Sequence, residues 1–440
     1  MPASPSLLIV PARFKTGKLY TQIATTSAGV VLASSGDFNV TRATTATRFN
    51  SAGLIESVAS GVPRLDYYTS GGTAGCPALL VEPSGTNVVV QSQNWLASGW
   101  RDDATANVTT VSATTGTLDP LGTNTANAIS PTSGSTSHLK VGSDAAISFT
   151  SGTIYSSSAF FKQGTGNAGR YIQIAWPALR FAANTFANFD LELGTVALVT
   201  GSTVTAGIEN YGNGWYRCRC TNTCISNGTN NGISMPLIET SGATRLPTFT
   251  GTTTDVLYGW GAQTEIGSIA TSYIPTTTAS ATRNADVINL SGAVSGCIGQ
   301  TEGTLYAEVD VRNFINGSRI VCLSDGTSDN RIIIQEGANS TLQAIVTNAT
   351  SGVVDISTAS GRTAGIYKIA IGYKQDDFAV YVNGSQTGTD NTGGVPTCNQ
   401  IFIGKIETTA TTNQLNDRIR AAALYTTRLT NAELAALTTL

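Results

Sequence analysis

Residues 378–384 read Phe-Ala-Val-Tyr-Val-Asn-Gly (FAVYVNG), an apolar and aromatic run that ends in an Asn-Gly pair. Aromatic and β-branched residues favour strands. The Asn383-Gly384 pair supplies the two positive-φ positions of a tight hairpin turn. The stretch therefore predicts a strand that enters a β-hairpin.

The same pattern of short alternating segments between turn signals recurs along the chain, for example at Arg170–Ala175 and Arg331–Gln335. Further pairs that mark turns are Asn213-Gly214, Asn227-Gly228, Asn316-Gly317 and Asp325-Gly326. Many short strands separated by such turns are typical of β-sandwiches and jelly rolls. No repeat of fixed length is present, which argues against a β-helix or a propeller. We therefore expect an all-β protein.

One segment, at the C-terminus, has the signature of a helix. Thr430 is a residue type that caps helices, and Glu433 stands where it completes a capping box. Leu434 and Leu437 then share a face. We expect a single notable helix at Thr430–Leu437.

The composition excludes two classes of partner. Charged residues make up only 12% of the 440 residues, the net charge is −3, and the 25 Lys and Arg are scattered singly. Nucleic acids and membrane surfaces need clustered basic residues, so neither is an expected partner. No apolar run approaches the roughly 20 residues of a membrane span. The run Leu7–Val10 is too short for a signal peptide, so we expect neither membrane insertion nor export by that route.

Two shifts in composition predict domain boundaries. Near Val88–Trp95 an apolar strand gives way to a long Thr/Ala/Asn-rich tract, and Pro275–Asp286 is a Thr/Ala/Ser-rich stretch typical of a connector. We expect an N-terminal β-rich anchoring segment over residues 1–92. A central β-sandwich over 93–285 and a C-terminal jelly roll over 286–440 then follow.

The N-terminal segment has apolar strands that a small unit cannot bury alone. They are SLLIV at 6–10, LLV at 79–81 and NVVV at 87–90. Because a short, glycine-interrupted segment has a poor ratio of surface to volume, we expect these strands to be buried in a homotrimer. Deletion of residues 1–92 is then expected to leave soluble monomers.

Between Arg42 and Asn87 the sequence resembles a segment found in many fibre and head-spike proteins of tailed bacteriophages. The matching pieces are Thr41–Arg48, Asn50–Glu56, Gly61–Tyr67, Leu79–Pro83 and Thr86-Asn87. A second match comprises Asn213–Arg217, Tyr258–Gln263, Glu265 and Thr271–Thr276. In such proteins this second match belongs to a β-sandwich similar to carbohydrate-binding modules.

The C-terminal part is similar to a concanavalin-A-like jelly roll of the laminin-G type, with the hairpin at 378–384, the strand at 423–425 and the helix after it. These resemblances imply a virion structural protein that is assembled in the host cytoplasm. Its expected partners are further copies of itself in a trimer, other virion proteins of the capsid, collar or tail, and a host surface glycan. The alternatives are a glycan-degrading tailspike enzyme and a bacterial surface adhesin.

The inventory of catalytic residue types argues against an enzyme. The only histidine, His138, lies in a Ser/Thr-rich stretch and is expected to be exposed, so a nucleophile–histidine arrangement is not expected. Asp190/Glu192 and Glu308/Asp310 are spaced i, i+2 on strands, which places each pair on one face. That face is more typical of solvated acids than of the paired carboxylates of a glycosidase.

Two sets of residues offer weak metal-binding patterns. Cys218, Cys220 and Cys224 provide three thiols, whereas structural zinc sites use four ligands, so a buried apolar row is the expected role. The seven cysteines are dispersed and odd in number, which does not indicate a disulfide framework. In domains of the laminin-G type, loop oxygens often hold Ca²⁺. That resemblance makes Asp325, Asp329, Asp376 and Asp377 the candidate Ca²⁺ ligands, and no other cofactor is expected.

Glycan binding calls for aromatic faces flanked by polar groups. The five tryptophans are Trp95, Trp100, Trp176, Trp215 and Trp260, all in or near the central region. Trp215 and Trp260 lie on alternating strands and are expected in the core. Trp100 and Trp176, beside irregular sequence, are the candidate sugar platforms, with core packing as the alternative.

Overall fold

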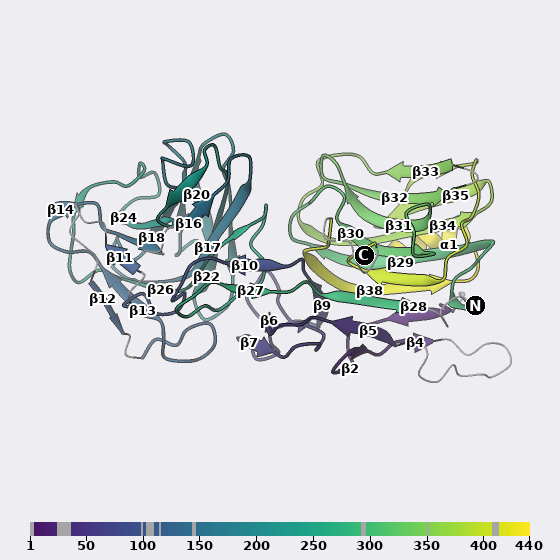
Figure 1. The fold of residues 1–440 in the computed structure, drawn as a ribbon, viewed down its shortest axis with the longest axis horizontal. Coiled ribbons are helices and arrows are strands. Elements are labelled where there is room, and N and C mark those ends of the chain that lie inside the picture. Colours follow the sequence, from purple (N-terminus) through teal and green to yellow (C-terminus); the bar gives the residue numbers. More distant parts are fainter. Residues whose placement is uncertain are drawn as a thin grey trace.

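The computed structural model describes residues 4–23, 37–97, 100–102, 110–113, 116–142, 147–291, 296–349, 352–406 and 413–440. In these ranges the chain forms two β-sandwiches that lie side by side along the long axis of the molecule (Figure 1). The all-β expectation is confirmed. The expected helix is confirmed as α1 (Asn431–Thr438), where Thr430 and Glu433 form the capping box.

One sheet of the C-terminal sandwich has nine strands. Its path runs β36 (Ser385–Asp390), β35 (Asp377–Val382), β34 (Gly365–Lys374), β29 (Glu302–Val311), β38 (Asp417–Tyr425), β1 (Leu7–Ile9) and β4 (Gln22–Ile23). Strand β38 also pairs with β9 (Ala78–Val81), which pairs with β8 (Leu65–Asp66). The expected turn at Asn383-Gly384, with positive φ at both residues, joins β35 to β36.

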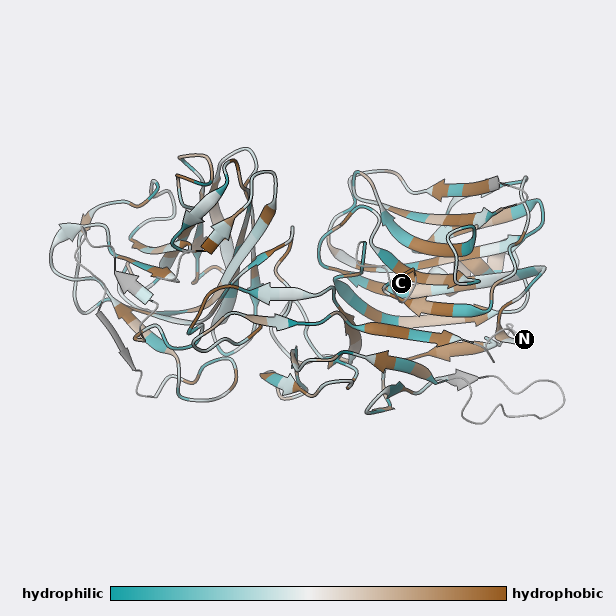
Figure 2. Cartoon of the chain, in the orientation of Figure 1, coloured by the Kyte–Doolittle hydropathy of each residue, from teal (hydrophilic) through white to brown (hydrophobic). Residues whose placement is uncertain are grey.

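The facing sheet also has nine strands. Its order is β2 (Phe14–Lys15), β3 (Lys18–Leu19), β5 (Phe38–Thr41), β28 (Val287–Ser291), β37 (Gln400–Ile403), β30 (Arg319–Ser324), β31 (Asn330–Gly337), β32 (Thr341–Asn348) and β33 (Gly352–Ser357). Apolar and polar residues alternate along many of these strands (Figure 2), so that the inward rows form one core between the sheets.

Strands from the first 92 residues complete the C-terminal sandwich, which differs from the division expected at residue 92. β1 and β9 each pair with β38, and β5 pairs with β28. The apolar residues Leu7, Ile9, Leu79 and Val81 belong to the same core as the C-terminal strands. The premise that these apolar strands need a trimer for burial is therefore corrected, because the chain's own C-terminal sheets bury them.

The central sandwich consists of two six-stranded sheets. The first runs β11 (Trp100–Asp102), β15 (Leu139–Gly142), β24 (Ser234–Ile238), β18 (Tyr171–Ala175), β19 (Phe186–Asp190) and β20 (Thr195–Thr200). The second runs β12 (Thr110–Ala113), β13 (Asn127–Ser130), β26 (Val256–Ile266), β17 (Ile154–Thr165), β22 (Trp215–Thr223) and β21 (Thr205–Asn210). Two short ribbons complete this half, namely β14 (Ser135–Thr136) with β25 (Phe249–Thr250) and β16 (Ile147–Phe149) with β23 (Gly228–Asn230).

The chain enters and leaves the central sandwich through one two-stranded connection, in which β10 (Gly85–Asn87) pairs with β27 (Ala281–Arg283). The hairpin of β6 (Ala46–Phe49) and β7 (Ile55–Val58) lies at this junction (Figure 1). Ile55 of this hairpin packs with Phe160 and Trp260 on the outer face of the second central sheet. The central sandwich is thus inserted between strands of the C-terminal sandwich.

Candidate functional site

A pocket of about 480 Å³ lies where three turns meet at the junction between the sandwiches. The turns are the one between β6 and β7, the loop that follows β8 and the one between β21 and β22. The lining consists of Ser51, Ala52, Gly53, Gly71, Gly72, Thr73, Ala74, Asn210, Gly212, Asn213, Gly214 and Tyr216. One wall therefore comes from the N-terminal part of the chain and the other from the central sandwich.

Two glycines let these walls meet backbone to backbone. Gly72 and Gly212 both have positive φ, at 73° and 78°. A Cβ on Gly212 would lie 2.4 Å from the carbonyl oxygen of Gly72, and a Cβ on Gly72 would lie 2.6 Å from the nitrogen of Gly212. Larger residues would force the two turns apart, so the shape of the pocket depends on glycine at both places.

The pocket presents amide and hydroxyl groups. Asn210 Oδ1 accepts a hydrogen bond from the Gly212 backbone at 2.9 Å, while its Nδ2 has no partner in the described ranges. Asn213 is exposed at φ 52°, and Thr73 is exposed on the opposite wall. These groups offer both donors and acceptors to a polar ligand.

A half-buried tyrosine adds an aromatic surface. Tyr216 lies directly opposite Asn210 in the register of β21 and β22, so the two side chains share a face. Its ring packs against Gly194, where a Cβ would come within 2.7 Å of Tyr216 Cε1. This contact holds the ring in place without hiding it from the pocket that it lines.

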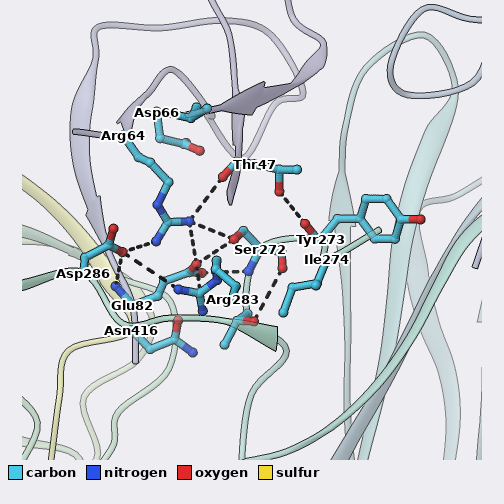
Figure 3. A network of polar contacts seen from close by, with 12 residues as sticks. Thr47, Arg64, Asp66, Glu82, Ser272, Tyr273, Ile274, Arg283, Asp286 and Asn416 are labelled. Carbon is cyan, nitrogen blue, oxygen red and sulfur yellow. Dashed lines mark hydrogen bonds and ion pairs between the residues drawn. The ribbon is translucent and has the colours of Figure 1, made fainter. Parts of the chain in front are cut away.

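Beside the pocket, a buried network of ionic groups joins the two sandwiches (Figure 3). Glu82 accepts hydrogen bonds from Arg64 at 2.7 Å and from Arg312 at 3.2 Å. It also accepts from Ser272, through the backbone nitrogen at 2.8 Å and the hydroxyl at 2.7 Å. Burial raises the pKa of Glu82, but the arginines outweigh burial and hold the pKa well below its usual range.

Asp286 is the second acid of this network. It accepts hydrogen bonds from Arg42 at 2.8 Å, from Arg64 and from the backbone nitrogen of Glu82 at 3.1 Å. Nearby, Arg418 contacts Asp66 at 2.9 Å and lies over the ring of Tyr68. Every carboxylate here is paired with arginine, so the network stabilises the junction.

A second pair of buried acids, Glu336 and Asp417, is linked to this network by Arg312, which lies 3.8 Å from Asp417. Glu336 of β31 and Asp417 of β38 come from opposite sheets, and both are buried. Burial and then the charge of Asp417 raise the pKa of Glu336 to about 10. Burial raises the pKa of Asp417 to about 6, against the lowering effects of Glu336 and Arg312. Both carboxyl groups therefore hold a proton more strongly than free carboxyl groups do, and neither lines the pocket.

The two tryptophans predicted as sugar platforms are core residues, which corrects that expectation. Trp176 is 0% exposed and donates from Nε1 to Cys220 Sγ at 3.1 Å. Trp100 is 8% exposed and stacks on Trp95 with ring centroids 4.6 Å apart. Neither has a free face for a sugar. The core roles expected for Trp215 and Trp260 are confirmed.

The four candidate Ca²⁺ ligands are not brought together. Asp325 and Asp329 lie between β30 and β31, whereas Asp376 and Asp377 lie at the turn between β34 and β35 in the other sheet. Asp325 accepts from Thr327 and Asn330, Asp329 from Ser328, Asp376 from the Gly393 backbone, and Asp377 from Arg428. No three His, Cys, Asp or Glu residues in the described part of the chain are grouped to hold a metal ion.

His138 is buried, which corrects the expectation of an exposed residue. Its Nδ1 accepts from the Thr132 backbone at 3.3 Å, and its Nε2 lies 3.1 Å from the carbonyl oxygen of Phe249. Because Nδ1 accepts and a carbonyl can only accept, these contacts assign the hydrogen-bond donor role to Nε2. The histidine is thus used in packing.

The acids and cysteines singled out from the sequence also have structural roles. Asp190 and Glu192 both pair with Arg170, Glu308 pairs with Arg420 at 2.8 Å, and Asp310 lies 3.9 Å from Arg418. The expected buried row of Cys218, Cys220 and Cys224 is confirmed, and the three thiols are free. Burial raises the pKa of Cys218 and Cys220, which keeps them protonated.

Comparisons with known proteins identify no family for this chain. No protein-family model and no curated protein matches the chain in sequence. No helix in the described ranges is long and apolar enough to span a membrane.

Parts of the chain can be superposed on solved structures. The carbohydrate-binding module CBM40 of a Ruminococcus gnavus IT-sialidase matches 34% of this chain and 86% of its own, with 13% identity and a TM-score of 0.29. Domain 4 of the arabinanase AbnA from Geobacillus stearothermophilus, solved with arabinotriose, matches 39% of this chain and 82% of its own, with 13% identity and a TM-score of 0.30. A heptameric SAP-like pentraxin from Limulus polyphemus matches 30% of this chain and 68% of its own, with 18% identity and a TM-score of 0.24. Overlaps of this size carry no conclusion about a ligand.

Proposed function

We propose that this chain is a non-enzymatic glycan-binding protein of a tailed-phage particle, displayed as a fibre, spike or surface decoration. The pocket between the three turns is the glycan site. The observation that carries the proposal is the make-up of this pocket, in which amides, hydroxyls and a tyrosine ring surround about 480 Å³ of space.

The size and chemistry of the pocket suit a saccharide. Small-molecule sites are usually clefts of roughly 300–1,000 Å³ with a few placed polar groups. Sugar hydroxyls need partners that donate and accept, which Asn210, Asn213 and Thr73 provide. The C–H face of a sugar ring packs against an aromatic face, which Tyr216 provides.

The same lining argues for binding without turnover. Glycoside hydrolases use two carboxyl groups that flank the scissile bond. None of the residues that line the pocket is Asp, Glu or His. The acid pair of Glu336 and Asp417 is buried and does not line the pocket. An enzyme would need a catalytic acid at the bound sugar.

The phage part of the proposal is supported by the resemblance between Arg42 and Asn87. Arg42, Arg64, Asp66 and Glu82 of that segment are buried in the ionic network at the junction. In the proposed particle the chain is a homotrimer, contacts other virion proteins and meets a host surface glycan. Three weak sites on one trimer would act together through their effective concentration.

The test is binding of host-surface oligosaccharides to single-site variants, measured by calorimetry. Asn213→Gly keeps the positive φ of the turn and removes the carboxamide, and Tyr216→Ala removes the ring. Each substitution is expected to weaken binding of the oligosaccharide by about tenfold, because it removes one hydrogen bond or one ring contact with the sugar.

The control is Asn316→Gly, which makes the same change in an exposed Asn-Gly turn of the C-terminal sandwich. Equal binding by Asn213→Gly, Tyr216→Ala and the control would refute the site. Shortening of the oligosaccharide during incubation would refute the non-enzymatic role. Absence of the chain from gradient-purified particles would refute the virion role.

A further inference from the structure

The rim of the pocket carries a lysine whose charge has no acidic partner in the described ranges. Lys162 lies on β17 and is half-buried. A Cβ on Gly214, which lines the pocket, would lie 3.4 Å from Lys162 Cε. The end of the lysine side chain therefore lies beside the turn that forms one wall.

The strands around Lys162 hold its side chain in position. In the cross-strand register Lys162 is opposite Trp215 on β22 and opposite Tyr258 on β26. Directly opposed side chains lie on the same face and contact one another. The hydrocarbon part of the lysine is thus packed between two aromatic residues, which leaves the ammonium group at the surface.

Two acids near the pocket pair with arginine, and a third, the buried Asp119, is hydrogen-bonded within its own loop. Glu209, on the edge strand β21, lies 3.9 Å from Arg219. Glu56, on β7, accepts from Arg48 at 2.6 Å. The residues that line the pocket carry no charge. Lys162 is therefore a positive charge beside the pocket that has no ion-pair partner in the described part of the chain.

We propose that the bound glycan is acidic and that Lys162 pairs with its carboxylate as a specificity-determining residue. This inference rests on the proposed function of the pocket and adds the class of ligand. A neutral sugar would leave the ammonium without a partner, whereas a uronic or nonulosonic acid would neutralise it while its hydroxyls contact the amides of the pocket.

The experiment compares acidic oligosaccharides with their carboxyl-reduced forms, in which each carboxylate has become a primary alcohol. The probes are oligomers of glucuronic, galacturonic and N-acetylneuraminic acid, titrated into the full chain by calorimetry. At least one acidic oligomer is expected to bind about three- to tenfold more tightly than its reduced form, as for a partly exposed ion pair.

Two substitutions assign this preference to the lysine. Lys162→Gln is expected to abolish the preference for the acidic form, and Lys162→Arg is expected to keep it. Lys374→Gln is the matched control, because it makes the same change of charge in the C-terminal sandwich, where Lys374 faces Glu302 at 3.6 Å. The binding preference of this control is expected to equal that of the parent chain.

Salt provides an independent readout. The preference of the parent chain for the acidic over the reduced oligosaccharide is expected to decrease as the ionic strength rises from about 0.01 M to about 0.15 M, because the screening length falls from ~30 Å to ~8 Å. Lys162→Gln is expected to bind independently of salt.

Equal binding of acidic and reduced forms, or an unchanged preference in Lys162→Gln, would overturn the inference while the proposed function stands. If neither form of any oligomer binds, both the inference and the proposed site fail.

Discussion

Replacing Glu82 by glutamine keeps the shape of the side chain and removes the charge that three buried arginines share. Glu82 lies 2.7 Å from Arg64, 3.2 Å from Arg312 and 3.5 Å from Arg283. The side chains of Glu82 and Arg64 are fully buried, and those of the other two nearly so. The substitution therefore leaves positive charges in the interior that water cannot reach.

The expected cost in the free energy of unfolding is about 3–5 kcal/mol, the usual effect of removing one partner of a buried ion pair. A native domain is typically stable by about 5–15 kcal/mol, so this loss is a large fraction of the total. The matched control is Glu302→Gln, whose partner Lys374 is exposed at 3.6 Å. An exposed pair of this kind contributes about 0–1 kcal/mol.

The assay is urea unfolding followed by circular dichroism, with the two variants measured beside the parent chain. The sign of the pH dependence follows from the lowered pKa of Glu82. Its stabilisation is present above the unfolded pKa of about 4.3 and is lost as the pH falls toward the folded pKa. The difference between parent and Glu82→Gln should thus be largest at neutral pH and narrow in acid. If Glu82→Gln unfolds at the same urea concentration as the control, the network does not stabilise the junction as argued.

Three further predictions concern other parts of the chain. The pKa of Glu336 is raised to about 10, so the protonated form of Glu336 stabilises the folded chain. This stabilisation is fully present below pH ~4.3 and declines as the pH rises, by at most about 1.4 kcal/mol per pH unit. Glu336→Gln should remove this decline, so the urea midpoints of parent and variant should diverge between pH 6 and pH 9. Midpoints that stay parallel would contradict the raised pKa of Glu336. Deletion of residues 1–92 should unfold the C-terminal sandwich rather than release soluble monomers, because it removes β1, β5 and β9 from the core. A folded deletion product in circular dichroism and gel filtration would contradict this prediction. Gly72→Ala should weaken glycan binding by more than about tenfold because its Cβ would meet Asn210 and Gly212, whereas Gly17→Ala, with a similar φ and open space, should bind as the parent does.

Local features of the sequence were sufficient to predict the elements themselves. The hairpin turn at Asn383-Gly384 depends on residues that tolerate positive φ, and the helix at the C-terminus depends on the capping pair Thr430 and Glu433. The inward row of Cys218 and Cys220 follows from the two-residue period of a strand. Each of these signals acts within a few residues, so it can be identified without knowing the partner strands.

The pairing of distant segments was decided only by the tertiary structure. β1 could satisfy its hydrogen bonds with any apolar strand, and nothing near Leu7 specifies β38, more than 400 residues later. The same holds for the contact of Glu336 with Asp417, and for the burial of Trp100 and Trp176 beside irregular sequence.

The candidate site is also a feature that only the tertiary structure decided. Asn213-Gly214 is recognisable as a turn, but its role in a pocket depends on the meeting of Gly72 with Gly212 across two parts of the chain. Side-chain type and spacing determine which face of a strand is buried, whereas a pocket forms from the few places where separate turns come close. That closeness depends on the packing of the two sandwiches and on the buried arginines and acids that hold them together.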